Sequence, residues 1–484
     1  MILQKSLQIK KNNVFKTLSR YYSISSSSSS SSSASNKLSN DLQHPILDKL
    51  KSKETIKIDD KQRNKKNSNE NHLFKAKTQL MRDFIQDALY NPKSGYFTTK
   101  EVIIPENVQV KPLNSLANFK EYNNYLHDLY GQLEHAWLTP VELFKPYYSR
   151  AISRYIVEKY SQQQHPDTPL KIYEIGAGSG TNAVSILDFI KDNHPQIYEN
   201  MEYTIIEISK LLAEKQVQRI KNKHPNVKIN INNTSVFNWT KTMEEQECFV
   251  VLTEVIDNLP HDKITHSFNG SFETVIHSTL ENSLSKNQKH LIREELSKIN
   301  DPVIIEYLEA EKIWSGKSDQ DKSKLKQKLD NLLSMFKEDE SVWVPTVCFK
   351  LFQILAKFFP RHHLVLADFD YIPSIVKGKN SPTVQHKQRV KDQTQVKYES
   401  IDLDDVTLEV GSCDIFFPYE WDQLYKMYCY TNKDRIGFDL ANVKTFKHKD
   451  FIKQYGQQDL HLTETKSKYN PILEDYKNMS FLIS

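Results

Sequence analysis

The stretch Leu170-Lys171-Ile172-Tyr173-Glu174-Ile175 has the pattern of a short strand, and Gly176-Ala177-Gly178-Ser179-Gly180-Thr181 follows it at once. Three glycines alternate within five positions, although the 484-residue chain contains only 11 glycines. Because glycine has no Cβ, the backbone N–H groups of such a turn can approach a ligand closely, and the positive end of the following helix points toward it. The sequence therefore predicts a ligand-binding strand, turn and helix over residues 170–192.

Strand and helix patterns continue to alternate beyond this unit. The strand patterns lie at 201–208, 227–231 and 249–252, with a helical pattern at 211–221. This alternation predicts an α/β fold with a doubly wound, Rossmann-like sheet, whose ligands lie beyond the carboxyl ends of the strands. Glu174, Glu207 and Glu254 should converge at that edge.

The residues around the glycine turn indicate which cofactor binds there. The turn reads G-x-G-x-G after an acidic residue, whereas dinucleotide-binding enzymes use G-x-G-x-x-G. S-adenosylmethionine has an ammonium group where NAD has a pyrophosphate, and a carboxylate attracts the first and repels the second. An acidic side chain at the end of the second strand can accept hydrogen bonds from both ribose hydroxyls. We predict S-adenosylmethionine as the cofactor, bound by Glu174, Gly176, Gly178, Gly180 and Glu207, with residues 233–235 reaching the adenine. A solvent-facing strand end is the alternative for Glu174.

A polar segment, Thr253-Glu254-Val255-Ile256-Asp257-Asn258-Leu259-Pro260, follows the fourth strand. A guanidinium group is planar, has five N–H donors and keeps its charge, so a pair of carboxylates holds it well. We predict that Glu254 and Asp257 are the catalytic residues and orient a guanidinium nitrogen toward the methyl group. In the alternative, Asp257 caps the turn into a following helix and Glu254 contacts only the cofactor.

The composition gives no indication of nucleic acid binding, a transmembrane helix or a metal site. The 65 Lys and Arg residues nearly balance the 61 Asp and Glu residues, and the net charge of +4 does not indicate nucleic acid binding. No run approaches the roughly 18 consecutive apolar residues of a transmembrane helix. The four cysteines lie far apart without zinc-ligand spacing, so no metal site is predicted, and no motif specifies the oligomeric state.

The amino-terminal segment has the composition of a targeting sequence. No acidic residue precedes Asp41, while basic residues interrupt an apolar set. This pattern predicts a mitochondrial presequence over residues 1–24, because a basic amphipathic segment suits a negatively polarised membrane. A basic terminus without a targeting role is the alternative. Residues 25–72 begin with an unbroken serine run and are rich in Ser, Lys and Asn, so we expect a disordered tether there.

Several blocks of the chain resemble the MidA-like methyltransferase family. They are Met81–Phe84 with Ala88–Phe97, Leu138–Phe144, Glu207–Ser209, Thr253–Pro260 and Gly411–Ile415. Mitochondrial members of this family are protein arginine methyltransferases that assist the assembly of respiratory complex I. The resemblance implies a class I methyltransferase fold, an enzyme that methylates an arginine of a complex I subunit with S-adenosylmethionine, and a location in the mitochondrial matrix.

The blocks suggest a division into domains and also leave alternatives open. We expect an N-terminal helical or lid region at 73–165, a cofactor-binding core at 166–264, a polar insertion after the fourth strand at 265–345, and the rest of the methyltransferase domain with its tail at 346–484. The family's Gly-Asp-Phe element is replaced by Glu134-His135-Ala136-Trp137, and Thr253 stands where Asn is expected. An assembly chaperone that binds S-adenosylmethionine without efficient methyl transfer is therefore an alternative. A nicotinamide oxidoreductase on the same fold is another.

Overall fold

The structure is a computed structural model of the chain. It describes residues 77–100, 110–134, 138–162, 168–239, 243–281, 289–316, 339–391 and 396–484. The predicted presequence and tether lie outside these residues, as do residues 135–137, which replace most of the family's Gly-Asp-Phe element.

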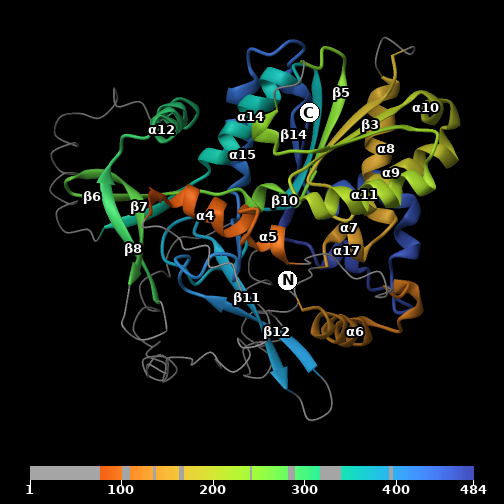
Figure 1. Cartoon of the computed structure of the whole chain (residues 1–484). Coiled ribbons are helices and arrows are strands. Elements are labelled where there is room, and N and C mark those ends of the chain that lie inside the picture. The colour runs from red at the N-terminus through yellow and green to blue at the C-terminus, as the bar shows by residue number, and fades with distance from the viewer. Residues whose placement is uncertain are drawn as a thin grey trace, which may run out of the picture. The chain divides into compact units, whose positions relative to one another are not determined.

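A seven-stranded sheet carries the predicted cofactor-binding unit (Figure 1). Its strands are, in spatial order, β4 (Lys228–Asn233), β3 (Glu202–Glu207), β2 (Lys171–Ile175), β5 (Cys248–Thr253), β10 (His362–Phe369), β15 (Met479–Ile483) and β14 (Lys444–Lys447). The five neighbouring strands β4, β3, β2, β5 and β10 are parallel to one another. Strand β15 is antiparallel to both of its neighbours, β10 and β14. The strand order reverses at β2, which has β3 on one side and β5 on the other, and ligands bind at such a switch point. The predicted doubly wound α/β fold is confirmed.

Helices cover both faces of this sheet, so its central strands are apolar on both sides. Phe249 and Val251 of β5 belong to the core cluster that includes α8, α9 and α16. Their neighbours Val250 and Leu252 belong to the cluster that includes α12, α14 and α15. Successive side chains of a strand point to opposite faces, which explains the continuous apolar run in the sequence. The helices are α8 (Tyr147–Ser161), α9 (Thr181–Asn193), α10 (Pro195–Asn200), α11 (Lys210–Lys223), α12 (Pro302–Trp314), α14 (Thr346–Phe358), α15 (Trp421–Asn432), α16 (His448–Gly456) and α17 (Pro471–Glu474).

The region before the cofactor-binding core consists mainly of helices. They are α4 (Met81–Tyr90), α5 (Tyr96–Thr99), α6 (Phe119–Gln132) and α7 (Pro140–Leu143). Arg82 fixes α4 in place by donating to two carboxylates, to Asp262 Oδ2 at 2.7 Å and to Asp301 Oδ2 at 2.6 Å. This ion-pair network attaches α4 to the segment that follows the predicted catalytic residues.

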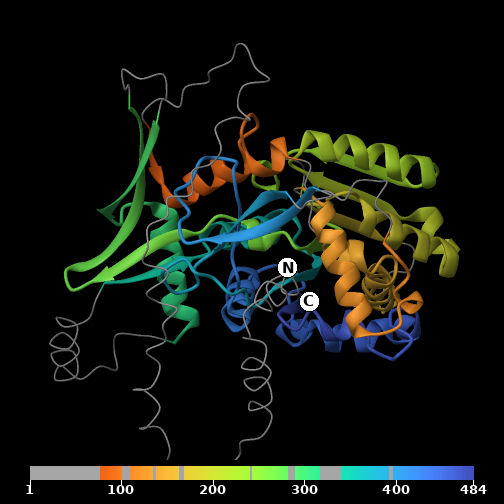
Figure 2. The same ribbon diagram turned by 90° about the horizontal axis from the view of Figure 1, so that it is seen from below.

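Two smaller sheets complete the described chain. One has the order β1-β7-β6-β9, with β8 paired to β7, and it lies on the side of α4 away from α9 and α11 (Figures 1 and 2). Most of it comes from the predicted insertion, and the domain boundaries themselves stay predictions. The other sheet has the order β12-β11-β13. Their strands are β1 (Lys77–Leu80), β6 (Asp262–Ser267), β7 (Gly270–Glu281), β8 (Lys289–Lys298), β9 (Glu340–Val344), β11 (Thr383–Lys391), β12 (Val396–Leu403) and β13 (Asp414–Phe416). None of the helices in the described ranges is long and apolar enough to cross a membrane.

Candidate functional site

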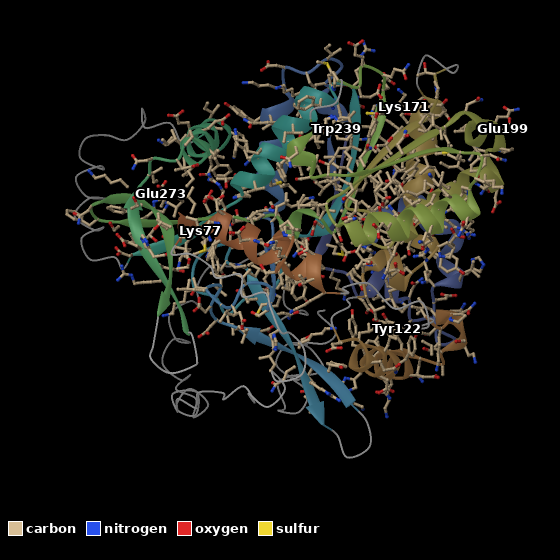
Figure 3. The ribbon with its side chains drawn as sticks, in the orientation of Figure 1. Lys77, Tyr122, Lys171, Glu199, Trp239 and Glu273 are labelled. Carbon is tan, nitrogen blue, oxygen red and sulfur yellow. The ribbon has the colours of Figure 1, made fainter. Side chains whose placement is uncertain are left out.

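A cavity of about 310 Å³ lies at the carboxyl ends of β2, β3, β5 and β10. Helices α4 to α7, strand β13, the loops that follow these strands and residues 475–478 supply further parts of its wall. In Figure 3, Lys171 marks the amino end of β2 at the top of the view, while Tyr122 of α6 lies at the bottom. The N-terminal helices therefore cover the edge of the sheet at which the sequence predicts ligand binding.

The glycine turn forms one wall of the cavity. Gly176, Gly178 and Gly180 have φ angles of 70°, 54° and 78°, a left-handed conformation that L side chains rarely adopt. Gly176 and Gly178 line the cavity, and a Cβ on Gly178 would meet no atom within 4 Å. Gly180 lies behind this wall, where a Cβ would approach Gln216 Cγ of α11 at 3.4 Å. A Cβ on Gly176 would come within 3.0 Å of Val255 Cγ2. The turn thus has open space beside the backbone at Gly178, and it packs closely against Val255 at Gly176 and against α11 at Gly180.

Glu174 lies just below the turn, and it is only 1% exposed, so its alternative as a solvent-facing strand end is wrong. Its carboxylate accepts hydrogen bonds from Asn182 Nδ2 at 2.8 Å and from Tyr203 Oη at 2.9 Å. Burial raises the pKa of Glu174 to about 7, although both hydrogen bonds oppose this shift. Asn182 lines the cavity and Glu174 does not. Direct contact between Glu174 and the cofactor stays a prediction. In the structure, the Glu174 carboxylate holds Asn182, which lines the cavity.

Glu207 reaches the cavity from the end of β3, as the sequence predicts. Its carboxylate accepts from the backbone N–H of Ser209 at 2.9 Å and from Gln216 Nε2 at 3.0 Å. Gln216 Nε2 also donates to the carbonyl of Gly178 at 2.8 Å, so this amide ties Glu207 to the glycine turn. Burial raises the pKa of Glu207 to about 7. These contacts bring together two of the elements predicted to bind the cofactor.

The residues expected at the adenine divide into two groups. Thr234 and Ser235 line the cavity. Asn233 instead donates from Nδ2 to the carbonyls of Glu207 at 2.9 Å and Ile208 at 3.2 Å. Asn233 therefore supports the backbone at the end of β3, and its neighbours form the wall.

Glu254 and Asp257 both lie in the cavity wall, where Asp257 is buried and Glu254 is half-buried. Glu254 Oε1 and Asp257 Oδ1 have no hydrogen-bond partner among the described residues. Burial raises the pKa of each carboxyl well above its ordinary value, and the negative charge of Asp368 raises both further. Asp257 is the middle residue of the short 3-10 helix η5 (Ile256–Asn258) and caps no following helix, so the capping role proposed as an alternative is wrong. The other half of that alternative, in which Glu254 contacts only the cofactor, stays a prediction. Two carboxylates that each have a buried oxygen without a partner favour a ligand that brings hydrogen-bond donors.

The remaining wall adds carboxylates that the sequence alone did not single out. Asp414 of β13 is buried and accepts from Asn258 Nδ2 at 3.1 Å, and burial raises its pKa to about 7. The sequence marked it only as part of the block Gly411–Ile415. The lining residues with carboxylates are Glu142, Glu207, Glu254, Asp257, Asp414 and Asp475. No Lys, Arg or His is among the lining residues that the structure describes, so the wall is acidic.

Glu142 connects the N-terminal region to the glycine turn. It follows Thr139, whose hydroxyl caps α7 by accepting from the N–H of Glu142 at 3.3 Å. The Glu142 carboxylate accepts from Thr181 Oγ1 at 2.6 Å and from the hydroxyl of Ser179. Burial opposes the charge, but these hydrogen bonds and Lys145 lower the pKa of Glu142 below its ordinary value. The charged form therefore holds α7 against the turn.

These features fit S-adenosylmethionine. The bare backbone at Gly178 admits close approach, Glu207 offers acceptors to hydroxyl groups, and the acidic wall suits the ammonium and sulfonium charges. The described residues contain no group of three or more His, Cys, Asp or Glu side chains that could hold a metal ion.

Comparisons with known proteins bear on the family, the fold and the cofactor. Residues 151–439 match the family described as "Putative S-adenosyl-L-methionine-dependent methyltransferase". The protein arginine methyltransferase NDUFAF7 homolog, mitochondrial, of Schizosaccharomyces pombe is 24% identical over 310 residues, which span 62% of this chain and 66% of that protein. A protein of Burkholderia thailandensis, solved with S-adenosyl-homocysteine bound and in native form, has a TM-score of 0.50 at 11% identity, covering 84% of this chain and 87% of its own. The last likeness concerns the fold alone.

The family match covers more than half of the chain, and it agrees with the resemblance that the sequence blocks indicate. The predicted cofactor is confirmed, which sets aside the nicotinamide alternative. The chain belongs to the family of S-adenosyl-L-methionine-dependent methyltransferases.

Proposed function

We propose that this chain is a mitochondrial protein arginine N-methyltransferase and that its substrate is a subunit of respiratory complex I. The acidic cavity wall is the observation that carries this proposal. The cavity holds the predicted pair Glu254 and Asp257 together with Asp414, and no described basic residue lines it. A guanidinium group would supply both the positive charge and the hydrogen-bond donors that these carboxylates lack.

When bound, S-adenosylmethionine supplies an electrophilic methyl group on a positively charged sulfur. The protein contributes the position of the nucleophile and an acceptor for its proton. In the proposed step, Glu254 and Asp257 hold the guanidinium so that one nitrogen faces the methyl group. The C–S bond breaks as the C–N bond forms, and the N–H proton of that nitrogen passes to the unpartnered Oδ1 of Asp257. A carboxyl whose pKa is raised by burial is suited to keep that proton.

The proposed location and partner rest on the amino-terminal sequence and on the relatives of the chain. The first 40 residues have the acid-free, basic pattern of a presequence. The relative from Schizosaccharomyces pombe is named as mitochondrial and as a protein arginine methyltransferase. The complex I substrate follows from the resemblance to the MidA-like family, and location in the matrix follows from both.

Transfer of a labelled methyl group tests the proposal. The full chain is incubated with labelled S-adenosylmethionine and a mitochondrial protein extract, and the protein hydrolysate is separated into amino acids. We expect the label in methylarginine, and we expect Asp257→Asn to lose at least about 100-fold of the rate, because that carboxylate places the nucleophile. The control Asp459→Asn removes a buried carboxylate that pairs with Arg150 and Arg154 outside the cavity, and it should retain the rate.

Two outcomes contradict the proposal. Label found in methyllysine would show that the site accepts another nucleophile. No transfer by the parent chain, despite measurable binding of S-adenosylhomocysteine, would favour the assembly chaperone.

A further inference from the structure

Asp368 lies behind the cavity wall at the end of β10, and it is 1% exposed. One carboxylate oxygen, Oδ2, accepts hydrogen bonds from three consecutive backbone N–H groups: those of Val255 at 3.1 Å, Ile256 at 2.9 Å and Asp257 at 3.3 Å. The other oxygen accepts from the N–H of Phe369 at 2.8 Å. Both oxygens are therefore fully used within the protein, and Asp368 does not line the cavity.

The turn that Asp368 holds is the one that carries the two predicted catalytic carboxylates. It starts at Glu254, whose φ of 54° is left-handed and unfavourable for a residue with a side chain. The N–H of Glu254 bonds to the carbonyl of Ala367 at 2.9 Å, and the next three N–H groups converge on Asp368. Successive N–H groups that converge in this way form a concave site for an anion. Here the protein fills that site with its own carboxylate, and the side chains of Glu254 and Asp257 reach the cavity.

The same carboxylate influences the charge of the pair. Burial raises the pKa of Asp368 to about 7, while its four backbone hydrogen bonds favour the ionised form. After burial, the negative charge of Asp368 is the largest cause that raises the pKa of both Glu254 and Asp257. The charge of Glu142 also raises the pKa of Glu254, and the charge of Asp414 also raises the pKa of Asp257. The positive charges of Lys100 and Lys387 lower the pKa of Asp414, against the larger effect of burial. The tyrosines that face this cluster are Tyr90, Tyr130, Tyr148, Tyr419 and Tyr476.

We propose that Asp368 is a positioning residue for methyl transfer, which fixes the backbone of residues 255–257 and, through its charge, sets the pH at which Glu254 and Asp257 release their protons. The inference rests on the proposed function, since it assigns to this pair the orientation and deprotonation of the nucleophile.

The variant Asp368→Asn removes the charge and keeps one oxygen acceptor for the turn, at the loss of the hydrogen bond from the N–H of Phe369. An amide oxygen can still accept from the three N–H groups, whereas the negative charge is lost. We expect kcat to fall about tenfold and the acid limb of the kcat/KM profile to move to lower pH by about one unit, because the like charge that keeps protons on the pair is removed. Asp459→Asn, the matched buried carboxylate outside the cavity, should leave the limb in place. A slower enzyme with an unmoved limb would overturn the proposal.

Infrared spectroscopy of the S-adenosylhomocysteine complex measures the protonation of Glu254 and Asp257 without turnover. The C=O band of the protonated pair, assigned by its loss in Glu254→Gln and Asp257→Asn, should disappear at lower pH in Asp368→Asn than in the parent. If the pH midpoint of this band is the same in Asp368→Asn and in the parent, the proposed role of Asp368 is contradicted. This test does not depend on methyl transfer, whereas a parent that transfers no methyl group would contradict the proposed function. If Asp368→Asn does not fold, the double variant Glu254→Gln/Asp257→Asn provides the reciprocal test, because the C=O band of Asp368 should then titrate at lower pH than in the parent. An unchanged band there would also overturn the proposal.

Discussion

Replacing Gly178 by alanine tests whether the bare backbone of the glycine turn is a cofactor contact. Gly178 has a φ of 54°, and a Cβ there would meet no protein atom within 4 Å. The only cost of Gly178→Ala to the free protein is therefore the left-handed conformation, about 1–2 kcal/mol. Because Gly178 lines the cavity, we expect the new methyl group to project into it and to exclude part of the cofactor.

Gly437 provides a matched control in the loop after α15. Its φ of 74° is also left-handed, a Cβ there would likewise meet nothing within 4 Å, and it does not line the cavity. Both variants should lose the same 1–2 kcal/mol of stability without ligand. Only Gly178→Ala should lose affinity for S-adenosylhomocysteine, at least about tenfold or 1.4 kcal/mol.

Two assays measure the pair of effects. Calorimetric titration gives the affinity for S-adenosylhomocysteine. Thermal unfolding with and without this ligand gives the stabilisation of the folded protein by binding, which is about 2.7 kcal/mol at a ligand concentration 100 times Kd. If Gly178→Ala binds as tightly as Gly437→Ala and the parent, the turn is not a cofactor contact, and the reasoning from its missing Cβ atoms is refuted.

Three further variants probe the supports of the site. Arg82→Met should lower the free energy of unfolding in urea by about 3–5 kcal/mol, because it leaves the carboxylates of Asp262 and Asp301 without their cation. Glu142→Gln should weaken S-adenosylhomocysteine binding about tenfold in calorimetry, since a neutral amide holds the hydroxyls of the glycine turn less strongly. Glu174→Gln should flatten the pH dependence of Tm. Burial raises the pKa of Glu174 from 4.5 to about 7, so its stabilising contribution is fully present below pH 4.5 and is lost as the pH rises through about 7.

The local sequence pattern was sufficient to predict the central strands of the seven-stranded sheet. The predicted strand at 249–252 is β5 (Cys248–Thr253), and the predicted helix from Thr181 is α9 (Thr181–Asn193). Both followed from side-chain periodicity and from the glycine turn between strand and helix, which depend on neighbours in sequence. The same pattern placed Glu207 and Glu254 at the carboxyl edge, where the structure has them in the cavity wall.

Contacts between distant parts of the chain could not be predicted in this way. Asp368 binds backbone groups 111 to 113 residues away, and Asp414 meets Asn258 across 156 residues. No local signal distinguishes Asp368, near the end of β10, or Asp414, at the start of β13, from other carboxylates of the chain. Glu174 shows the opposite case, because its position before the turn suggested a cofactor contact, whereas its side chain bonds to Asn182 and Tyr203 behind the wall.

A crystal structure of the full chain with S-adenosylhomocysteine measures the central claim directly. The site described above predicts the homocysteine end beside Gly176 and Gly178, and the two ribose hydroxyls donating to the carboxylate of Glu207. Ligand bound outside this cavity, or a Glu207 carboxylate that contacts only Ser209 and Gln216 while the ligand is present, would contradict it.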